Sequence, residues 1–186
     1  APPMIRDQPG TANATGSVPI GGTFDATETG GAVYRLAAPD TGYATIQDAI
    51  NAVESSDETI EVRDNMIRSE TLDLSGLSYD NLTIDGAVLR PPGGSPAVIG
   101  SGNTTREVLR NCVLIRNTST GTPLVRNVGR VQFCTIVGPY AAGANALVEV
   151  NGTNNCDIWG TIIGNPAIAN WGTGGNPINK SGAGTL

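Results

Sequence analysis

The segment from Val108 to Gly160 repeats itself with a period of 22 residues. Sliding it along itself by this period aligns, without a gap, Cys112 with Cys134 and Cys156, Leu114 with Ile136 and Ile158, and Ile115 with Val137 and Trp159. Self-similarity at a fixed period is typical of proteins in which like units stack on one another. The apolar residues come in short clusters separated by Gly, Asn, Thr and Pro, which predicts short strands joined by turns rather than helices.

Each repeat is therefore predicted to form one coil, with parallel strands stacked about 4.8 Å apart and equivalent side chains in columns. Side chains two positions apart face the same way. We expect the core ladder to consist of Cys112, Cys134, Cys156, Leu114, Ile136 and Ile158. The residues between them, Val113, Thr135 and Asp157, are then expected to face outward.

The column of Ile115, Val137 and Trp159 points outward by the same alternation, although its residues are apolar. Two interpretations remain open. A bend after each strand turns these side chains back into the core, or they form an apolar stripe on the surface that contacts a partner subunit. In the second interpretation, Ile115, Val137 and Trp159 are subunit-interface residues.

The composition favours an all-β protein with many turns. Only 15% of the 186 residues are charged and 4% are aromatic, a profile that argues against a helical bundle. The net charge of −6 argues against nucleic acid or an anionic membrane as a partner. No apolar run reaches the length of a membrane span, and the first residues lack the pattern of a signal peptide.

The cysteine count gives no sign of a metal site. Three cysteines cannot all pair within the chain, and the chain contains no His to complete a zinc site. Inside a coil these cysteines are expected to be buried free thiols. We predict no catalytic residue, no cofactor-binding residue and no metal ligand.

The chain divides into three parts. Residues 1–40 are expected to be either a disordered tail or an extended arm that becomes ordered against a partner. Residues 41–170 are expected to form the coils, and residues 171–186 a tail rich in Gly and Asn. Within the second part, residues 45–53 are predicted to form a helix with one apolar face that caps the open end of the stack.

Four segments follow one another in an order that is typical of one superfamily: Tyr43–Val53, Thr59–Val62, Ser69–Leu74 and Asn81–Gly86. They resemble the opening of the pectate-lyase-like right-handed parallel β-helices, and the resemblance extends to about Gly164. It implies a right-handed parallel β-helix of about five coils, the last three begun by Leu109, Val131 and Ile158. The turn after Val62 departs from the pattern of the superfamily and is expected to be remodelled.

Polysaccharide-cleaving members of that superfamily use clustered acids, whereas the acids of this chain are scattered. Asp85 and Asp157 are the best candidates for a carboxylate on a strand face, although a solvated surface position is the better interpretation of each. Arg126 and Glu149 lie 23 positions apart, which predicts an ion pair between neighbouring coils.

The resemblance implies a non-catalytic structural virion protein, such as a homotrimeric capsid decoration (cement) protein or a spike. Such a protein attaches through its N-terminal arm, and the major capsid protein is an expected partner. It is expected in the virion, after assembly in the host cytoplasm. The alternative is a carbohydrate-active enzyme or a glycan-binding module, which is expected to be secreted.

Overall fold

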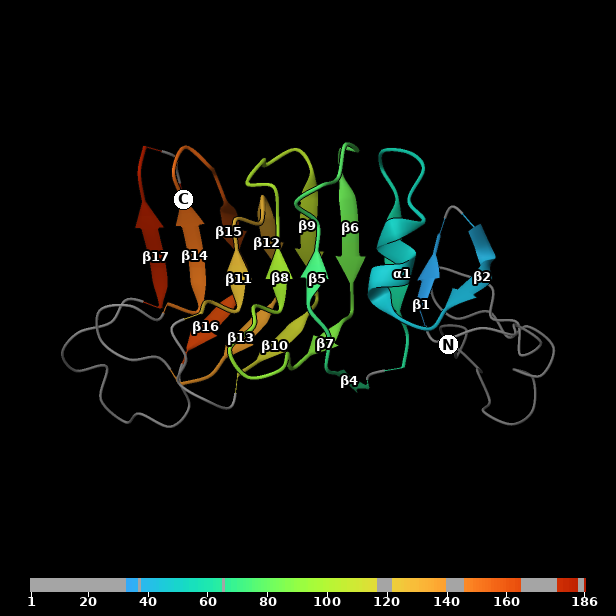
Figure 1. The fold of residues 1–186 in the computed structure, drawn as a ribbon, viewed down its shortest axis with the longest axis horizontal. Helices are drawn as coiled ribbons and strands as arrows, with labels where there is room; N and C mark the ends of the chain where they lie inside the picture. Colours follow the sequence, from blue (N-terminus) through green and yellow to red (C-terminus); the bar gives the residue numbers. More distant parts are fainter. Residues whose placement is uncertain are drawn as a thin grey trace, which may run out of the picture.

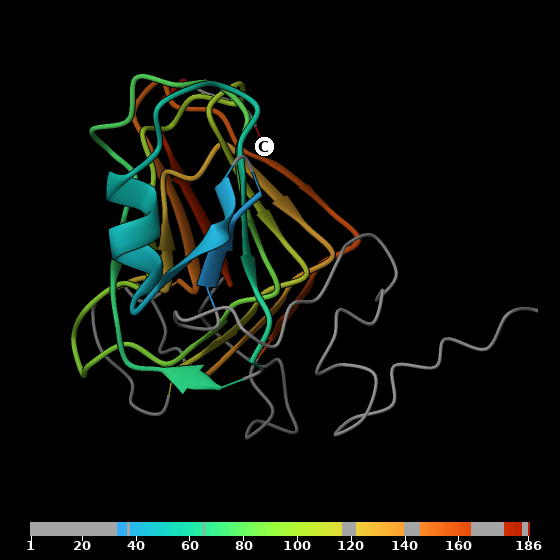
Figure 2. The same ribbon diagram turned by 90° about the vertical axis from the view of Figure 1, so that its right-hand side faces the viewer.

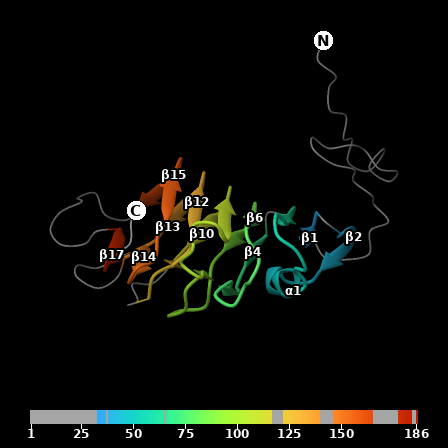
Figure 3. The same ribbon diagram turned by 90° about the horizontal axis from the view of Figure 1, so that it is seen from above.

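The computed structural model describes residues 33–36, 38–64, 66–116, 122–139, 146–164, 177–183 and 186. Within them the chain winds into a solenoid of stacked parallel strands, with one short helix near its N-terminal end (Figure 1). From that end, in Figure 2, the chain descends one sheet, crosses below and ascends the opposite sheet, turning clockwise as it recedes. The solenoid is therefore right-handed, as parallel crossovers almost always are. Seen from above, in Figure 3, its coils follow one another in sequence order.

Three sheets form the walls of the solenoid. Sheet A contains, in spatial order, β15 (Asp157–Trp159), β12 (Arg130–Gln132), β9 (Glu107–Arg110), β6 (Leu82–Asp85), β3 (Thr59–Val62), β1 (Val33–Arg35) and β2 (Ala38–Tyr43). Sheet B contains β16 (Ile162–Gly164), β13 (Thr135–Val137), β10 (Val113–Ile115), β7 (Val88–Leu89) and β4 (Ile67–Arg68). Sheet C contains β17 (Ile178–Ser181), β14 (Val148–Asn151), β11 (Val125–Arg126), β8 (Val98–Ile99) and β5 (Leu72–Asp73).

Each sheet stacks five parallel strands, so that five triplets of strands are joined by four steps from coil to coil. The predicted right-handed parallel β-helix is confirmed, with about four turns rather than about five coils. The expected starting residues are also confirmed, because Leu109 pairs with Val131 and Val131 with Ile158. The turn from β3 to β4 is longer than the equivalent turns, since Thr59 aligns with Thr83 while Ile67 aligns with Val88.

The core is made of columns of aliphatic side chains that face the axis. In sheet A the column contains Ile60, Ile84, Leu109 and Val131, all at most 1% exposed. Complete burial of such a side chain stabilises the fold by about 1.5–3 kcal/mol. In the last coil the equivalent residues Ile158, Ile163 and Ile178 are only partly buried, since no described strand stacks on top of them.

The N-terminal end of the stack is capped by α1 (Ile46–Asn51). Ile46, Ala49 and Ile50 are buried against the core, which confirms the helix expected over residues 45–53 and its apolar face. The helix is slightly shorter than expected, because Thr45 is its N-cap and accepts a hydrogen bond from Asp48 N at 3.0 Å. The Glu70 carboxylate accepts the N–H groups of Ile46 and Gln47 at 3.4 and 3.3 Å, where negative charge is favoured by the helix dipole.

The cap also includes β1, which pairs antiparallel with β3 and covers the first edge of sheet A. All three residues of β1 are buried, so the expected arm ends earlier than residue 40. Residues 1–32 lie outside the described residues. At the other end, β17 pairs with β14, so residues expected to be a tail belong to the last coil. Residues 165–176 also lie outside the described part.

Candidate functional site

The coil-to-coil register determines which of the predicted columns exist. Val113 pairs with Thr135, a step of 22 residues, but Thr135 pairs with Ile162, a step of 27. The extra residues lie mainly in the corner between β14 and β15, which is longer than the corner between β11 and β12. The second step of the 22-residue alignment is therefore wrong for the strands of sheet B.

The expected column of three cysteines is replaced by Cys112, Cys134 and Thr161. Each donates a hydrogen bond into the coil before it: Cys112 Sγ to Ile84 O at 3.5 Å, Cys134 Sγ to Leu109 O at 3.6 Å, and Thr161 Oγ1 to Val131 O at 3.3 Å. Thr161 therefore takes the place in the fifth coil that the alignment assigned to Cys156. All three residues of this column have a short side chain with a polar hydrogen.

The cysteines are free and buried, as expected. Cys156 is 1% exposed and lies in the core just before β15. Burial raises the pKa of its thiol to about 12. A hydrogen bond with Cys134, together with burial, raises the pKa of Cys112. Thiols held in their neutral form are poor nucleophiles, so Cys112 and Cys156 act as core residues.

Leu114 and Ile136 are neighbours in sheet B and are fully buried, as predicted for the ladder. Ile158 is not their neighbour, because Ile136 pairs with Ile163. Ile158 instead continues the inward column of sheet A above Val131. Its side chain faces the core as expected, but from sheet A rather than from sheet B.

The predicted outward column is also divided between two sheets. Ile115 and Val137 are paired neighbours on sheet B and are half-buried, and the next residue in their column is Gly164. Trp159 lies on sheet A, where it pairs with Gln132. Ile115, Val137 and Trp159 therefore do not form one stripe.

Sheet B nevertheless presents an apolar outer face. Its outward column contains Ile67, Val88, Val113, Thr135 and Ile162. Ile67 is 50% exposed and Ile162 is 67% exposed, while the residues between them are half-buried. Together with Ile115 and Val137, this column is called the sheet B face below. None of these seven residues is charged, while the exposed Arg90, which directly follows β7, borders the face beside Ile115.

A second surface feature lies at the corner between sheets A and B. In four successive coils this corner contains a residue in the left-handed region: Gly86 (φ 81°), Asn111 (φ 54°), Phe133 (φ 53°) and Gly160 (φ 60°). Gly and Asn tolerate this conformation, whereas a bulky residue is disfavoured there. Phe133 and Trp159 are both half exposed, and their rings meet edge to face with centroids 4.4 Å apart. This pair was not predicted from the sequence, because the two residues belong to different coils.

Two carboxylates on strand faces, those of Asp85 and Glu149, form ion pairs. Asp85 accepts hydrogen bonds from Arg110 Nη2 at 2.7 Å and from Asn111 Nδ2 at 2.8 Å. The predicted pair between Arg126 and Glu149 is confirmed, with Nε 3.2 Å from Oε1. Asp157 is exposed and lies opposite Arg130 in the register of sheet A.

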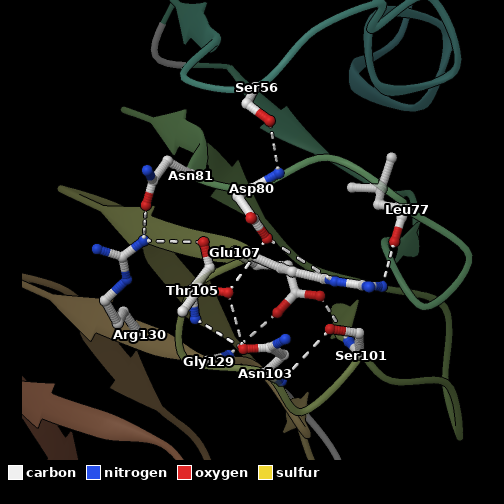
Figure 4. A network of polar contacts seen from close by, with 11 residues as sticks. Ser56, Leu77, Asp80, Asn81, Ser101, Asn103, Thr105, Glu107, Gly129 and Arg130 are labelled. Atoms are coloured by element: carbon white, nitrogen blue, oxygen red, sulfur yellow. Dashed lines mark hydrogen bonds and ion pairs between the residues drawn. The ribbon is translucent and has the colours of Figure 1, made fainter.

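Glu107 has a structural role that the sequence did not predict. It is 0% exposed and accepts the N–H groups of Ser101 at 2.7 Å and Gly129 at 3.3 Å (Figure 4). Burial raises the pKa of this carboxylate, against the lowering effect of these hydrogen bonds. Around it, Arg130 Nη2 donates to Asn81 Oδ1 at 2.6 Å, so that side chains of the second and fourth coils are joined. The arrangement holds the corners between sheets C and A together.

In the part of the chain that the structure describes, no group of three or more His, Cys, Asp or Glu side chains is placed to hold a metal ion. The same residues include no helix with the length and hydropathy needed to cross a membrane. Comparison of the chain with protein-family models, with curated proteins and with solved structures found no match in any of the three.

Proposed function

We propose that this chain is a non-catalytic structural protein that assembles as a homotrimer through the sheet B face. The proposed setting is a virion, where the trimer acts as a capsid decoration protein or a spike and is assembled in the host cytoplasm. Residues 1–32 precede the cap, and in this proposal they attach the trimer to another virion protein such as the major capsid protein. The setting and the attachment follow from the resemblance to pectate-lyase-like β-helices.

The observation that supports the proposed homotrimer is the apolar sheet B face. Its outward column runs across all five strands of the sheet, from Ile67 in the first coil to Ile162 in the last. In a protein with a net charge of −6, an uncharged face is where copies can meet without electrostatic repulsion. Around a symmetry axis, identical apolar faces bury one another, which removes their exposed residues from water.

The state of the carboxylates supports a structural role. A glycosidase needs two carboxyl groups placed on either side of the scissile bond. In this chain Asp85 is held by Arg110, Glu149 by Arg126 and Glu58 by Arg35. These side chains stabilise contacts between neighbouring segments of the fold.

The experiment is light scattering of the purified full chain after size exclusion. We expect the mass of a trimer, and a monomer for the Val113→Lys variant, whose charge enters the centre of the sheet B face. The matched control is Asn179→Lys, which adds the same charge at an exposed position of sheet C. A monomeric wild-type protein, or a trimer that tolerates Val113→Lys, would contradict the interface.

The catalytic alternative is tested with the same protein. It is incubated with polygalacturonate in the presence and absence of Ca²⁺, and unsaturated and reducing sugar ends are measured. We expect neither product. Release of either product, abolished by Asp157→Asn or Asp85→Asn, would replace the structural role with an enzymatic one.

A further inference from the structure

The backbone conformation at position 133 does not explain why a Phe occupies it. Asn111 forms the same corner one coil earlier with a similar φ, and Gly160 forms it one coil later. Either residue adopts the left-handed conformation at a lower cost than Phe. Strained positions of this kind cluster at functional sites, where the side chain has a use that outweighs the strain.

The ring of Phe133 is held in a defined position. It meets Trp159 at an interplanar angle of 69°, and it lies against Gly160, where an added Cβ would come within 2.6 Å of Phe133 Cδ1. Yet about half of each residue remains exposed, at 50% for Phe133 and 52% for Trp159. Two exposed rings fixed in this way lose little conformational freedom when a ligand binds.

Polar groups adjoin the rings. Gln132 pairs with Trp159 on one side and with Arg110 on the other, so the three side chains lie in one outward column of sheet A. Among the described residues, no hydrogen bond is formed by the side-chain amide of Gln132. Arg110 donates hydrogen bonds from Nε and Nη2 to Asp85 Oδ2, at 3.0 and 2.7 Å. Its Nη1 can therefore donate to another acceptor.

We propose that Trp159, Phe133 and Gln132 form a binding site for a pyranose ring of a neutral glycan. A pyranose has a face of C–H groups, which packs on an aromatic ring, and a rim of hydroxyls, which donate and accept hydrogen bonds. The Gln132 amide supplies one acceptor and two donors, and Arg110 Nη1 supplies a further donor. Because Asp85 compensates the charge of Arg110, the site favours a neutral sugar over an anionic one.

The site lies within one chain, so it does not depend on the proposed trimer. One shallow site of this kind is expected to bind with Kd on the order of 1 mM. An oligomer that presents several copies to a glycan-coated surface gains roughly 100-fold or more in avidity.

The test uses the full chain, fluorescently labelled, on a printed array of plant and bacterial glycans, followed by titration of the best-bound glycan by NMR. We expect neutral pyranose glycans to be retained, and binding to fall at least tenfold in Trp159→Ala and in Phe133→Asn. The control is Met66→Ala, which removes a 64% exposed side chain from the first coil and is expected to bind as wild type does.

The Phe133→Asn variant separates binding from folding, because Asn111 already forms the same corner. We expect its melting temperature to be unchanged or raised while glycan binding is lost. Three results overturn the proposal: no glycan bound above the level of Trp159→Ala, binding retained in both variants, or retention of a peptide or an acidic glycan only. The monomeric Val113→Lys variant keeps the monovalent Kd if the site is as proposed, whatever the outcome for the trimer.

Discussion

In the N-terminal cap, Arg35 Nε donates a hydrogen bond to Glu58 Oε2 at 2.7 Å, and Arg35 Nη2 donates to Oε1 at 3.0 Å. Both side chains are buried, at 8% and 2% exposure. Glu58 also accepts the N–H groups of Glu54 and Ser55, and Arg35 donates to the carbonyl of Ala52. One ion pair therefore joins β1 to the end of α1 and to the start of β3.

Loss of Arg35 is expected to be costly, because it leaves the Glu58 carboxylate buried without its cation. We predict that Arg35→Met lowers the free energy of unfolding by about 3–5 kcal/mol. The control is Arg126→Met, which breaks the more exposed pair with Glu149 and is expected to cost under about 1 kcal/mol. Urea denaturation measures both. Equal losses in the two variants would contradict the role of the buried pair.

Glu58 and Glu107 are predicted to give opposite pH dependences of stability. Burial alone raises the pKa of Glu58, but the hydrogen bonds from Arg35, Glu54 and Ser55 outweigh it, so the folded pKa is lowered. The stability from Glu58 is therefore present above its unfolded pKa, near 4.3, and is lost as the pH falls through the lowered folded value.

For Glu107 burial outweighs its hydrogen bonds and the folded pKa is raised. Above the folded pKa of Glu107, its ionised carboxylate therefore lowers the free energy of unfolding. This loss disappears as the pH falls below the pKa of Glu107 in the unfolded chain. Denaturation of wild type, Glu58→Gln and Glu107→Gln at neutral pH and near pH 4 tests both signs. On acidification, the difference in free energy of unfolding between wild type and Glu58→Gln should decrease. The corresponding difference between wild type and Glu107→Gln should change in favour of wild type. Parallel pH profiles in all three proteins would refute the assignment.

The contact between Phe133 and Gly160 can be measured with two glycine substitutions. Gly160→Ala and Gly152→Ala both place Ala in the left-handed region, at φ 60° and 66°, which costs about 1–2 kcal/mol. Only at Gly160 does the added Cβ meet a neighbour, the ring of Phe133, while at Gly152 nothing lies within 4 Å. We predict that Gly160→Ala has the larger effect on the melting temperature. The excess should disappear when Phe133→Asn is present in both backgrounds.

The register of the last coil can be tested by cross-linking. In a Cys112→Ser/Thr161→Cys variant, the introduced thiol and Cys134 lie on neighbouring parallel strands, about 4.8 Å apart. This spacing suits a disulfide. Oxidation with diamide, followed by peptide mass spectrometry, should join these two positions. A disulfide between Cys134 and Cys156 would support the 22-residue register instead.

The architecture was predictable because it depends on local patterns. Alternating apolar residues define strands, a 22-residue repeat indicates stacking, and Ile46, Ala49 and Ile50 mark one face of a capping helix. The pair of Arg126 and Glu149 was predictable for the same reason, since their separation is close to one coil.

The sequence by itself therefore determined that this protein is a solenoid of stacked parallel coils, with buried thiols and a helical cap. Only the tertiary structure decided which residues meet across coils, because the corners differ in length. A step of 27 residues into the last coil shifts the columns of sheets A and B by five positions. This shift put Thr161 rather than Cys156 above Cys134. It also separated Trp159 from Ile115 and Val137, and placed its ring beside Phe133.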